Sequence, residues 1–154
     1  VPSVGSHRNH RRRSDAWTAM MFLVDANVLS EPTKSAPNPK VVEWLTDHEG
    51  ELVVDAVVLG ELSVGILVYP AGRKRAALER WFESVVQTIE CLPWDAGVSL
   101  RWARMVSQLK RKGQSLPLLD SMIAATALHH GLTVVTRNTR DFQRAGVKVF
   151  DPFL

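Results

Sequence analysis

MFLVDANVLSE, residues 21–31, contains the apolar run Met21–Val24, which ends on the acid Asp25. Consecutive apolar residues without alternation are typical of a short strand buried on both faces of a parallel sheet. Three further acids lie at similar junctions: Glu61 interrupts the apolar segment 56–62, Asp120 opens the helical run 120–128, and Asp141 follows the strand-like run 132–136. Because acids are costly inside apolar runs, their recurrence there indicates one shared site.

Short strands and helices alternate along the chain after residue 20. The strands are expected at Phe22–Val24, Leu52–Val54, Thr88–Cys91, Thr133–Val135 and Val147–Phe150, and the helices at Pro39–Asp47, Ala56–Val68, Arg73–Val86, Asp95–Lys112 and Leu118–His129. The proline-rich segment 32–39 is expected to be irregular, and Gly131 is a plausible helix stop. This alternation favours an α/β fold with a parallel sheet. Ligands of such sheets bind beyond the carboxyl ends of the strands, where Asp25 and Asp141 fall.

Length and composition indicate one globular domain over residues 21–154. The chain has 154 residues, of which 45% are hydrophobic and 23% charged, as in ordinary globular proteins. No apolar run reaches the roughly 18 residues that span a membrane. Cys91 is the only cysteine, which excludes an intramolecular disulfide and a cysteine-based zinc site. The cytoplasm is the simplest compartment for such a chain.

The basic character of the chain comes from residues 1–20, which we expect to be disordered. They carry Arg8, Arg11, Arg12 and Arg13 against Asp15, whereas residues 21–154 hold 15 basic and 15 acidic side chains. The segment has no apolar period and no signal-peptide core. It is either a tag or upstream read-through, with the native start at residue 20 or 21, or a native arm that binds nucleic acid.

Each acid also has a purely structural reading. Asp120 shares a helical face with Ile123, Ala124 and Ala127, yet an acid in a first helical turn is also favoured by the helix dipole. Asp25 is able to cap the turn into a helix near Asn27, and Asp141 is able to act as an N-cap or to stabilise a short turn before Phe142.

Glu61 is the acid for which a structural reading is weakest. It shares a helical face with Val57, Val64 and Val68, which predicts a glutamate on a core-facing stripe. An unpaired glutamate is seldom buried for structural reasons alone.

The four acids together predict a metal site. Two carboxylates about 5 Å apart repel by roughly 3 kcal/mol at an effective dielectric near 20, so a cluster of four requires protons or cations. Oxygen ligands without Cys or His suit Mg²⁺ or Mn²⁺ rather than zinc. Such a site supports in-line hydrolysis of a phosphodiester bond by a metal-activated water.

Four segments carry a resemblance to a known family. VDANVLSE (residues 24–31), LGEL (59–62), LLDSMIAATAL (118–128) and VVTRNTRDF (134–142) resemble the PIN-domain ribonucleases, and most closely the VapC-type toxins of type II toxin–antitoxin pairs. The resemblance extends over essentially residues 21–153. It implies a PIN-like three-layer α/β/α fold with a central five-stranded parallel sheet in the order 3-2-1-4-5.

The resemblance also assigns roles to individual residues. Asp25, Glu61, Asp120 and Asp141 match the four acids that surround Mg²⁺ or Mn²⁺ and form the catalytic centre of the family. The polar side chains that match supporting positions of the pocket are Asn27, Thr136 and Asn138. The chain departs from the usual S-x-V-T-x-x-E-L pattern, because Asp55 stands at the serine position and Val58 at the threonine position; Asp55 still offers a helix cap.

Two basic clusters are candidates for contact with an RNA backbone. They are Arg73, Lys74 and Arg75, and Lys110, Arg111 and Lys112. Solvated helix ends are the alternative reading, and the helix dipole itself favours cations at a helix C-terminus.

The resemblance implies an endoribonuclease toxin that cuts RNA, with a tRNA or rRNA loop as the expected substrate. It further implies a cognate antitoxin and a homodimer. Two other functions remain open at this point: a PIN nuclease of RNA processing without an antitoxin, and a non-catalytic module that binds RNA or a partner protein.

Overall fold

A central sheet of five parallel strands organises residues 21–154, which are the residues that the computed structural model describes. The strands are β1 (Phe22–Val24), β2 (Leu52–Asp55), β3 (Glu90–Leu92), β4 (Thr133–Val135) and β5 (Val149–Phe150). Their order is β3-β2-β1-β4-β5, and every neighbouring pair is parallel. The expected order 3-2-1-4-5 is therefore confirmed. The expectations for residues 1–20 lie outside the described residues.

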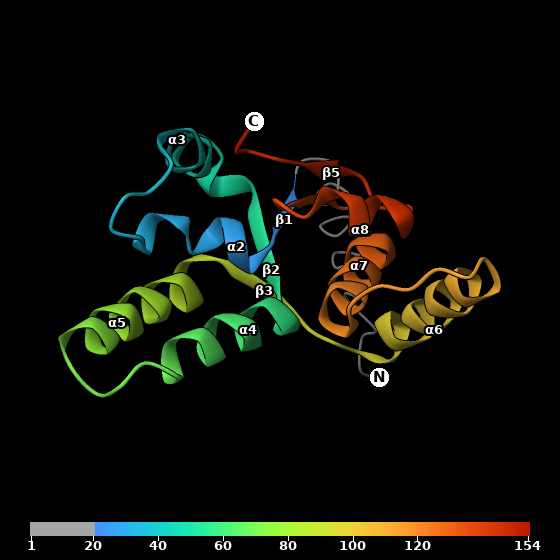
Figure 1. Ribbon diagram of the computed structural model, residues 1–154, viewed down its shortest axis with the longest axis horizontal. Coiled ribbons are helices and arrows are strands. Elements are labelled where there is room, and N and C mark those ends of the chain that lie inside the picture. Colours follow the sequence, from blue (N-terminus) through green and yellow to red (C-terminus); the bar gives the residue numbers. More distant parts are fainter. Residues whose placement is uncertain (1–20) are drawn as a thin grey trace, which may run out of the picture.

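Helices lie on both sides of the sheet, so the expected α/β architecture is confirmed (Figure 1). In that view α2 (Ala26–Leu29), α3 (Pro39–Asp47), α4 (Ala56–Leu67) and α5 (Arg73–Thr88) lie to the left of the strands. To their right lie α6 (Ala96–Arg111), α7 (Leu118–His130) and α8 (Thr139–Arg144). The 3-10 turns η1 (Glu31–Thr33) and η2 (Glu49–Glu51) flank α3 in the chain.

The strands are short because they cross only the buried middle of the protein. Leu23, Val24, Val54, Val134 and Val135 are at most 1% exposed, as expected for strands covered on both faces. β1 lies at the centre, between β2 and β4. Residues directly after β1 and β4 therefore emerge side by side at one edge of the sheet.

Local sequence signals set the helix ends. Asp55 and Asp95 cap α4 and α6 by accepting hydrogen bonds from Val58 N at 2.8 Å and Val98 N at 2.9 Å. Gly131 ends α7 with a φ of 67°, a left-handed conformation that glycine adopts without strain, which confirms it as the helix stop.

Several expected boundaries are wrong by a few residues. α5 extends to Thr88, so β3 begins at Glu90 rather than Thr88, and β5 is limited to Val149–Phe150. The short helix expected near Asn27 is α2, with Asp25 as its cap. α8 was not predicted as a helix, because six residues are too few to show a helical period. Segment 32–39 is irregular apart from η1 and the first residue of α3. Within residues 21–154, no helix is long and apolar enough to cross a membrane.

The predicted core-facing stripe through Glu61 is also wrong. Val64 and Val68 are 62% and 74% exposed, and α4 instead buries Val58, Leu62 and Ile66. The helix is apolar nearly all round, so its sequence does not identify the face that packs on the sheet. Glu61 lies at the border between the buried and the exposed faces.

Candidate active site

Asp25 is the most buried acid of the candidate site. It follows β1 directly, is 4% exposed, and caps α2 by accepting a hydrogen bond from Ala26 N at 2.8 Å. Its second carboxylate oxygen accepts hydrogen bonds from Thr136 Oγ1 at 2.8 Å and Asn27 Nδ2 at 3.2 Å. Burial raises the pKa of Asp25 above its ordinary value, and these hydrogen bonds oppose the rise.

Thr136 connects the ends of β1 and β4. It follows β4 directly and is fully buried, and its hydroxyl oxygen also accepts a hydrogen bond from Asn138 N at 3.0 Å. Asn27 in turn accepts a hydrogen bond from Arg137 N at 3.2 Å. These contacts join the chain after β1 to the chain after β4, and they hold Asp25 in one orientation.

Asn138 joins the two acids of the C-terminal half. Its Nδ2 donates hydrogen bonds to Asp120 Oδ2 at 3.0 Å and to Asp141 Oδ2 at 2.8 Å. Asp120 lies in the first turn of α7 and Asp141 in the first turn of α8. Burial and the charges of Asp25 and Asp141 raise the pKa of Asp120, against the lowering effect of Asn138.

Glu61 completes the cluster from the opposite side. Its pKa is raised to about 7, chiefly by burial and then by the charges of Asp25, Asp120 and Asp55. Its Oε1 is buried and has no hydrogen-bond donor among the described residues. The charges of Asp25 and Asp120 thus raise the pKa of Glu61, and the charge of Asp25 also raises the pKa of Asp120.

Asp55 adds a fifth carboxylate behind the cluster. It is 1% exposed, and burial raises its pKa. One oxygen caps α4, whereas Oδ2 has no hydrogen-bond donor within the part of the chain that the structure describes. The sequence showed Asp55 as a cap, but not its electrostatic contribution to Glu61, because the strand register that places it beside Asp25 is not visible in the sequence.

The donor set fits a hard divalent cation. Every candidate ligand is a carboxylate oxygen, and Glu61 Oε1 has no hydrogen-bond donor within residues 21–154, as expected of an oxygen that binds a cation. Within residues 21–154, however, no three His, Cys, Asp or Glu side chains are placed to hold an ion together as they stand. Asn138 Nδ2 instead bridges two of the acids.

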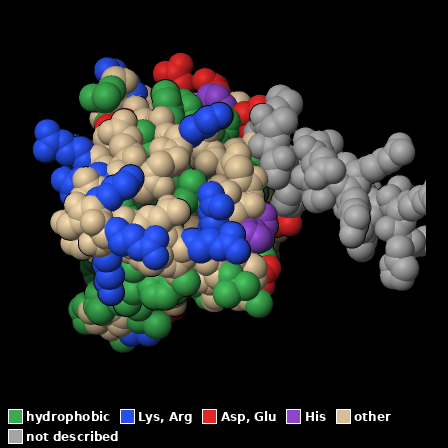
Figure 2. Space-filling model, turned by 90° about the vertical axis from the view of Figure 1, so that its right-hand side faces the viewer, with side chains coloured by type: hydrophobic (Ala, Val, Ile, Leu, Met, Phe, Trp, Pro, Cys, Tyr) green, Lys and Arg blue, Asp and Glu red, His purple; other side chains and the backbone are tan. Residues whose placement is uncertain are grey.

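The two basic clusters lie on different parts of the surface. Arg73, Lys74 and Arg75 begin α5; Arg75 pairs with Glu79 at 2.9 Å, and Lys74 lies 5.0 Å from the Tyr69 ring centroid. Lys110 and Arg111 end α6, and Lys112 caps it, which agrees with the reading as a helix end. Many Lys and Arg side chains cover the side of the molecule that carries α6, α7 and α8 (Figure 2).

A cavity of about 560 Å³ opens beside the acids. Asn27 and Glu61 line it at the site, and α4, α5 and the segment after α2 form its walls. Lys34 and Lys74 contribute cationic side chains, and Tyr69 and Trp81 contribute aromatic ones.

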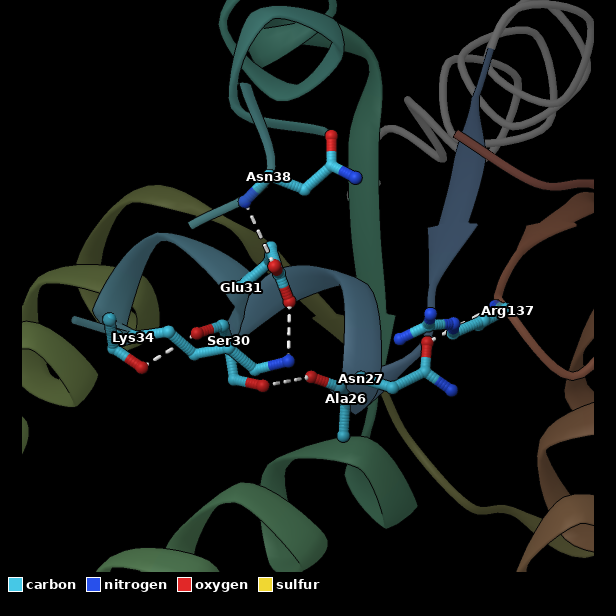
Figure 3. A network of polar contacts seen from close by, with 8 residues as sticks. Ala26, Asn27, Ser30, Glu31, Lys34, Asn38 and Arg137 are labelled. Carbon is cyan, nitrogen blue, oxygen red and sulfur yellow. Dashed lines mark hydrogen bonds and ion pairs between the residues drawn. The ribbon is translucent and has the colours of Figure 1, made fainter. Parts of the chain in front are cut away.

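Glu31 stabilises the wall of this cavity that follows α2 (Figure 3). It is 4% exposed, accepts a hydrogen bond from Asn38 N at 3.0 Å and pairs with Lys34 Nζ at 2.7 Å. These contacts lower its pKa, with the Lys34 hydrogen bond as the largest cause. No role was predicted for Glu31 from the sequence, although an acid two residues after the apolar pair Val28–Leu29 was a usable signal.

Comparison with known proteins identifies the family. The sequence matches the PIN domain family over residues 22–148. It is 39% identical to Toxin FitB of Neisseria gonorrhoeae, over 86% of this chain and 99% of that protein. It is 34% identical to VapC ribonuclease Y4jK of Sinorhizobium fredii, over 86% of this chain and 98% of that protein.

A solved structure shares the fold closely. FitAcB from Neisseria gonorrhoeae superposes with a TM-score of 0.82 at 36% identity, over 86% of this chain and 99% of that chain. The chain therefore belongs to the PIN domain family and, within it, to the VapC-type toxins.

Proposed function

We propose that this protein is a metal-dependent endoribonuclease toxin that hydrolyses RNA phosphodiester bonds in the cytoplasm and is neutralised by a cognate antitoxin. The observation that carries the proposal is the cluster of Asp25, Glu61 and Asp120, in which the charges of Asp25 and Asp120 raise the pKa of Glu61 and the charge of Asp25 raises the pKa of Asp120. A group of repelling carboxylates lowers stability unless a cation offsets it. This cost argues against a non-catalytic binding module, for which the acids have no use.

Asp25, Glu61, Asp120 and Asp141 are the residues that we assign to the metal. PIN-domain nucleases generally depend on a divalent metal, and the all-oxygen donor set favours Mg²⁺ or Mn²⁺ here. When bound, such an ion lowers the pKa of a water and offsets charge on the phosphate.

The residues around the acids hold and orient them. Thr136 and Asn27 fix Asp25 through its second oxygen, and Asn138 fixes the spacing of Asp120 and Asp141. Glu61 orients the attacking water through Oε1, which is free of other hydrogen bonds within the described residues.

The cavity beside Glu61 is the position that we assign to the antitoxin. Its volume of about 560 Å³ accommodates side chains of an extended peptide. A basic side chain of that peptide, placed against Glu61, offsets the same charges as the metal and so excludes it.

Two further partners belong to the proposal. The RNA substrate is expected to present a tRNA or rRNA loop, whose unstacked bases are open to contact. A homodimer is also expected, and the exposed Val64 and Val68 of α4 offer apolar area for it.

Cleavage of a panel of labelled structured RNAs tests the proposal. Wild-type protein, Asp120→Asn and the control Asp47→Asn, an exposed acid at the end of α3, are compared with Mn²⁺ and with EDTA. We expect the wild type and Asp47→Asn to cleave with Mn²⁺ only, and Asp120→Asn to be inactive but folded. Cleavage by Asp120→Asn at the wild-type rate would refute the assignment. Metal-independent cleavage would refute the mechanism.

A further inference from the structure

Acidic side chains are in excess in the first half of the described chain, and basic ones in the second. Residues 21–95 hold 12 acidic and 6 basic side chains, whereas residues 96–148 hold 2 acidic and 9 basic ones. The two acids of the second segment are Asp120 and Asp141, which already belong to the candidate site. The surface of α6, α7 and α8 therefore carries a strong excess of positive charge (Figure 2). Positive charge gathered on one face is typical of a nucleic-acid contact.

Helix α6 provides the most regular part of this surface. It contains no acid, and Arg101 and Arg104 are both exposed one helical turn apart. The ion pairs of residues 21–154 are Lys34–Glu31, Arg75–Glu79 and Arg144–Asp141, so Arg101 and Arg104 lack a carboxylate partner within the described part of the chain. Unpaired guanidinium groups are well suited to bind phosphate.

A hollow of about 260 Å³ lies beside these arginines, between α6 and α7. Arg101, Arg104 and His129 give it polar walls, and Leu100, which is 65% exposed, gives it an apolar one. Its volume is below that of usual sites for drug-sized ligands, and it suits a phosphate with part of a nucleotide. Arginine, histidine and an apolar side chain together are the groups that contact the backbone and bases of single-stranded RNA.

The imidazole ring of His129 lies against Gly97 of α6. A Cβ atom at position 97 would lie 2.8 Å from Cε1 of His129, so a larger residue there would require the ring to move. The short connection of residues 112–117 makes α6 and α7 antiparallel neighbours, and Trp102 Nε1 joins them by donating a hydrogen bond to Ser121 Oγ at 2.9 Å.

Helix α7 relates the hollow to the candidate active site. Asp120 lies in its first turn, and His129 of the hollow lies near its end. The two residues are nine positions apart, a distance of about 14 Å along the helix. At about 3.4 Å per nucleotide of a stacked strand, this distance corresponds to about four nucleotides.

We propose that Arg101, Arg104 and His129 form a second RNA-binding site, which holds a backbone phosphate of the substrate about four nucleotides from the scissile bond. This inference rests on the proposed function, because it extends the same RNA along α6. It adds residues beyond the two basic clusters of the sequence analysis, which lie at the ends of α5 and α6.

RNA binding at varied salt tests the site without cleavage. The double variant Arg101→Gln/Arg104→Gln is compared with wild type and with Lys40→Gln/Arg80→Gln, which removes two exposed charges from α3 and α5. In EDTA, the loss of two phosphate contacts should make the slope of log K against the logarithm of the salt concentration less negative by about 1.4. The control double variant should keep the wild-type slope.

RNA length provides the second comparison. Two RNAs share one cleavage site, and only the longer extends at least six nucleotides to each side. With Mn²⁺, the Arg101→Gln/Arg104→Gln variant should raise KM for the long RNA about tenfold, because binding weakens. It should cleave the short RNA as wild type does. His129→Ala should raise KM for the long RNA in the same direction.

The outcomes separate the two proposals. An unchanged salt slope together with an unchanged KM for the long RNA would overturn the second site. If Lys40→Gln/Arg80→Gln changed the salt slope and KM by as much, the second site would also be overturned, because the net charge of the protein would then explain RNA binding. If the α6 variant bound RNA normally but failed to bind the antitoxin, the surface would be a protein interface and the inference would be wrong. Absence of cleavage by wild type would contradict the proposed function alone, since the salt slope in EDTA would still report on the site.

Discussion

Replacing Glu61 by glutamine should stabilise the metal-free protein at pH 8. The folded protein raises the pKa of Glu61 from 4.5 to about 7, so folding takes up a proton between these pH values. Stability from this group is fully present below pH 4.5 and is lost as the pH rises through about 7. Glutamine keeps the size of the side chain but has no charge, so the variant should not lose stability in this way as the pH rises.

The magnitude follows from the same pKa values. One pKa unit corresponds to about 1.36 kcal/mol, so the rise in the pKa of Glu61 lowers the free energy of unfolding at pH 8 by at most about 3 kcal/mol. Because Glu61 is only half-buried, solvent screening reduces the effect to about 1–2 kcal/mol. For a domain of this size, that gain corresponds to an increase in Tm of about 3–8 °C at pH 8.

Urea unfolding in EDTA at several pH values from 4.5 to 8.5 provides the assay. Glu61→Gln should match the wild type near pH 4.5 and become more stable than it above pH 7. Glu43→Gln, at an exposed position of α3, is the matched control and should follow the wild-type curve. If wild type and Glu61→Gln gave parallel curves, the repulsion inferred at this site would be refuted. Residual pH dependence in Glu61→Gln is expected, because Asp25 and Asp120 also have raised pKa values.

Substitutions at three other positions test neighbouring parts of the site. Asp25→Asn should abolish RNA cleavage while the protein stays folded, and undiminished cleavage in a nuclease-free preparation would refute its catalytic role. Asn138→Ala removes the donor shared by Asp120 and Asp141, so urea unfolding in EDTA at pH 8 should show a loss of about 1–3 kcal/mol; unchanged stability would show that this bridge is not maintained in solution. Asp55→Ala should lose about 1 kcal/mol with the cap of α4, whereas Asp55→Ser keeps an acceptor without a buried charge and should be at least as stable as wild type; equal losses in both would contradict this account.

The sheet and the polar edge of the site were predictable because their signals are local. Apolar runs such as Phe22–Val24 and Thr133–Val135 identify buried strands, and an acid directly after such a run falls at the ligand-binding edge of a parallel sheet. The order of the strands came from the resemblance to a family. Composition alone does not distinguish it from other parallel orders.

The face of α4 was not predictable, and the reason is physical. A helix that is apolar nearly all round gives no amphipathic signal, so Val64 and Val68 were assigned to the core although they are exposed. The carboxamide bridge through Asn138 and the wall held by Glu31 depend on contacts between segments distant in sequence or on loop geometry. Such contacts appear only once the chain is folded.

The candidate site draws Asp25 and Glu61 from the first half of the chain and Asp120 and Asp141 from the second, and β4 must pair with β1 before they meet. A polypeptide still being synthesised lacks this pairing until residues past 141 have left the ribosome. If these acids are the catalytic ones, the growing chain is therefore unable to cut the RNA that surrounds it during its own translation. A fragment that ends anywhere between α4 and α7 would be inactive for the same reason, because it lacks Asp120 and Asp141.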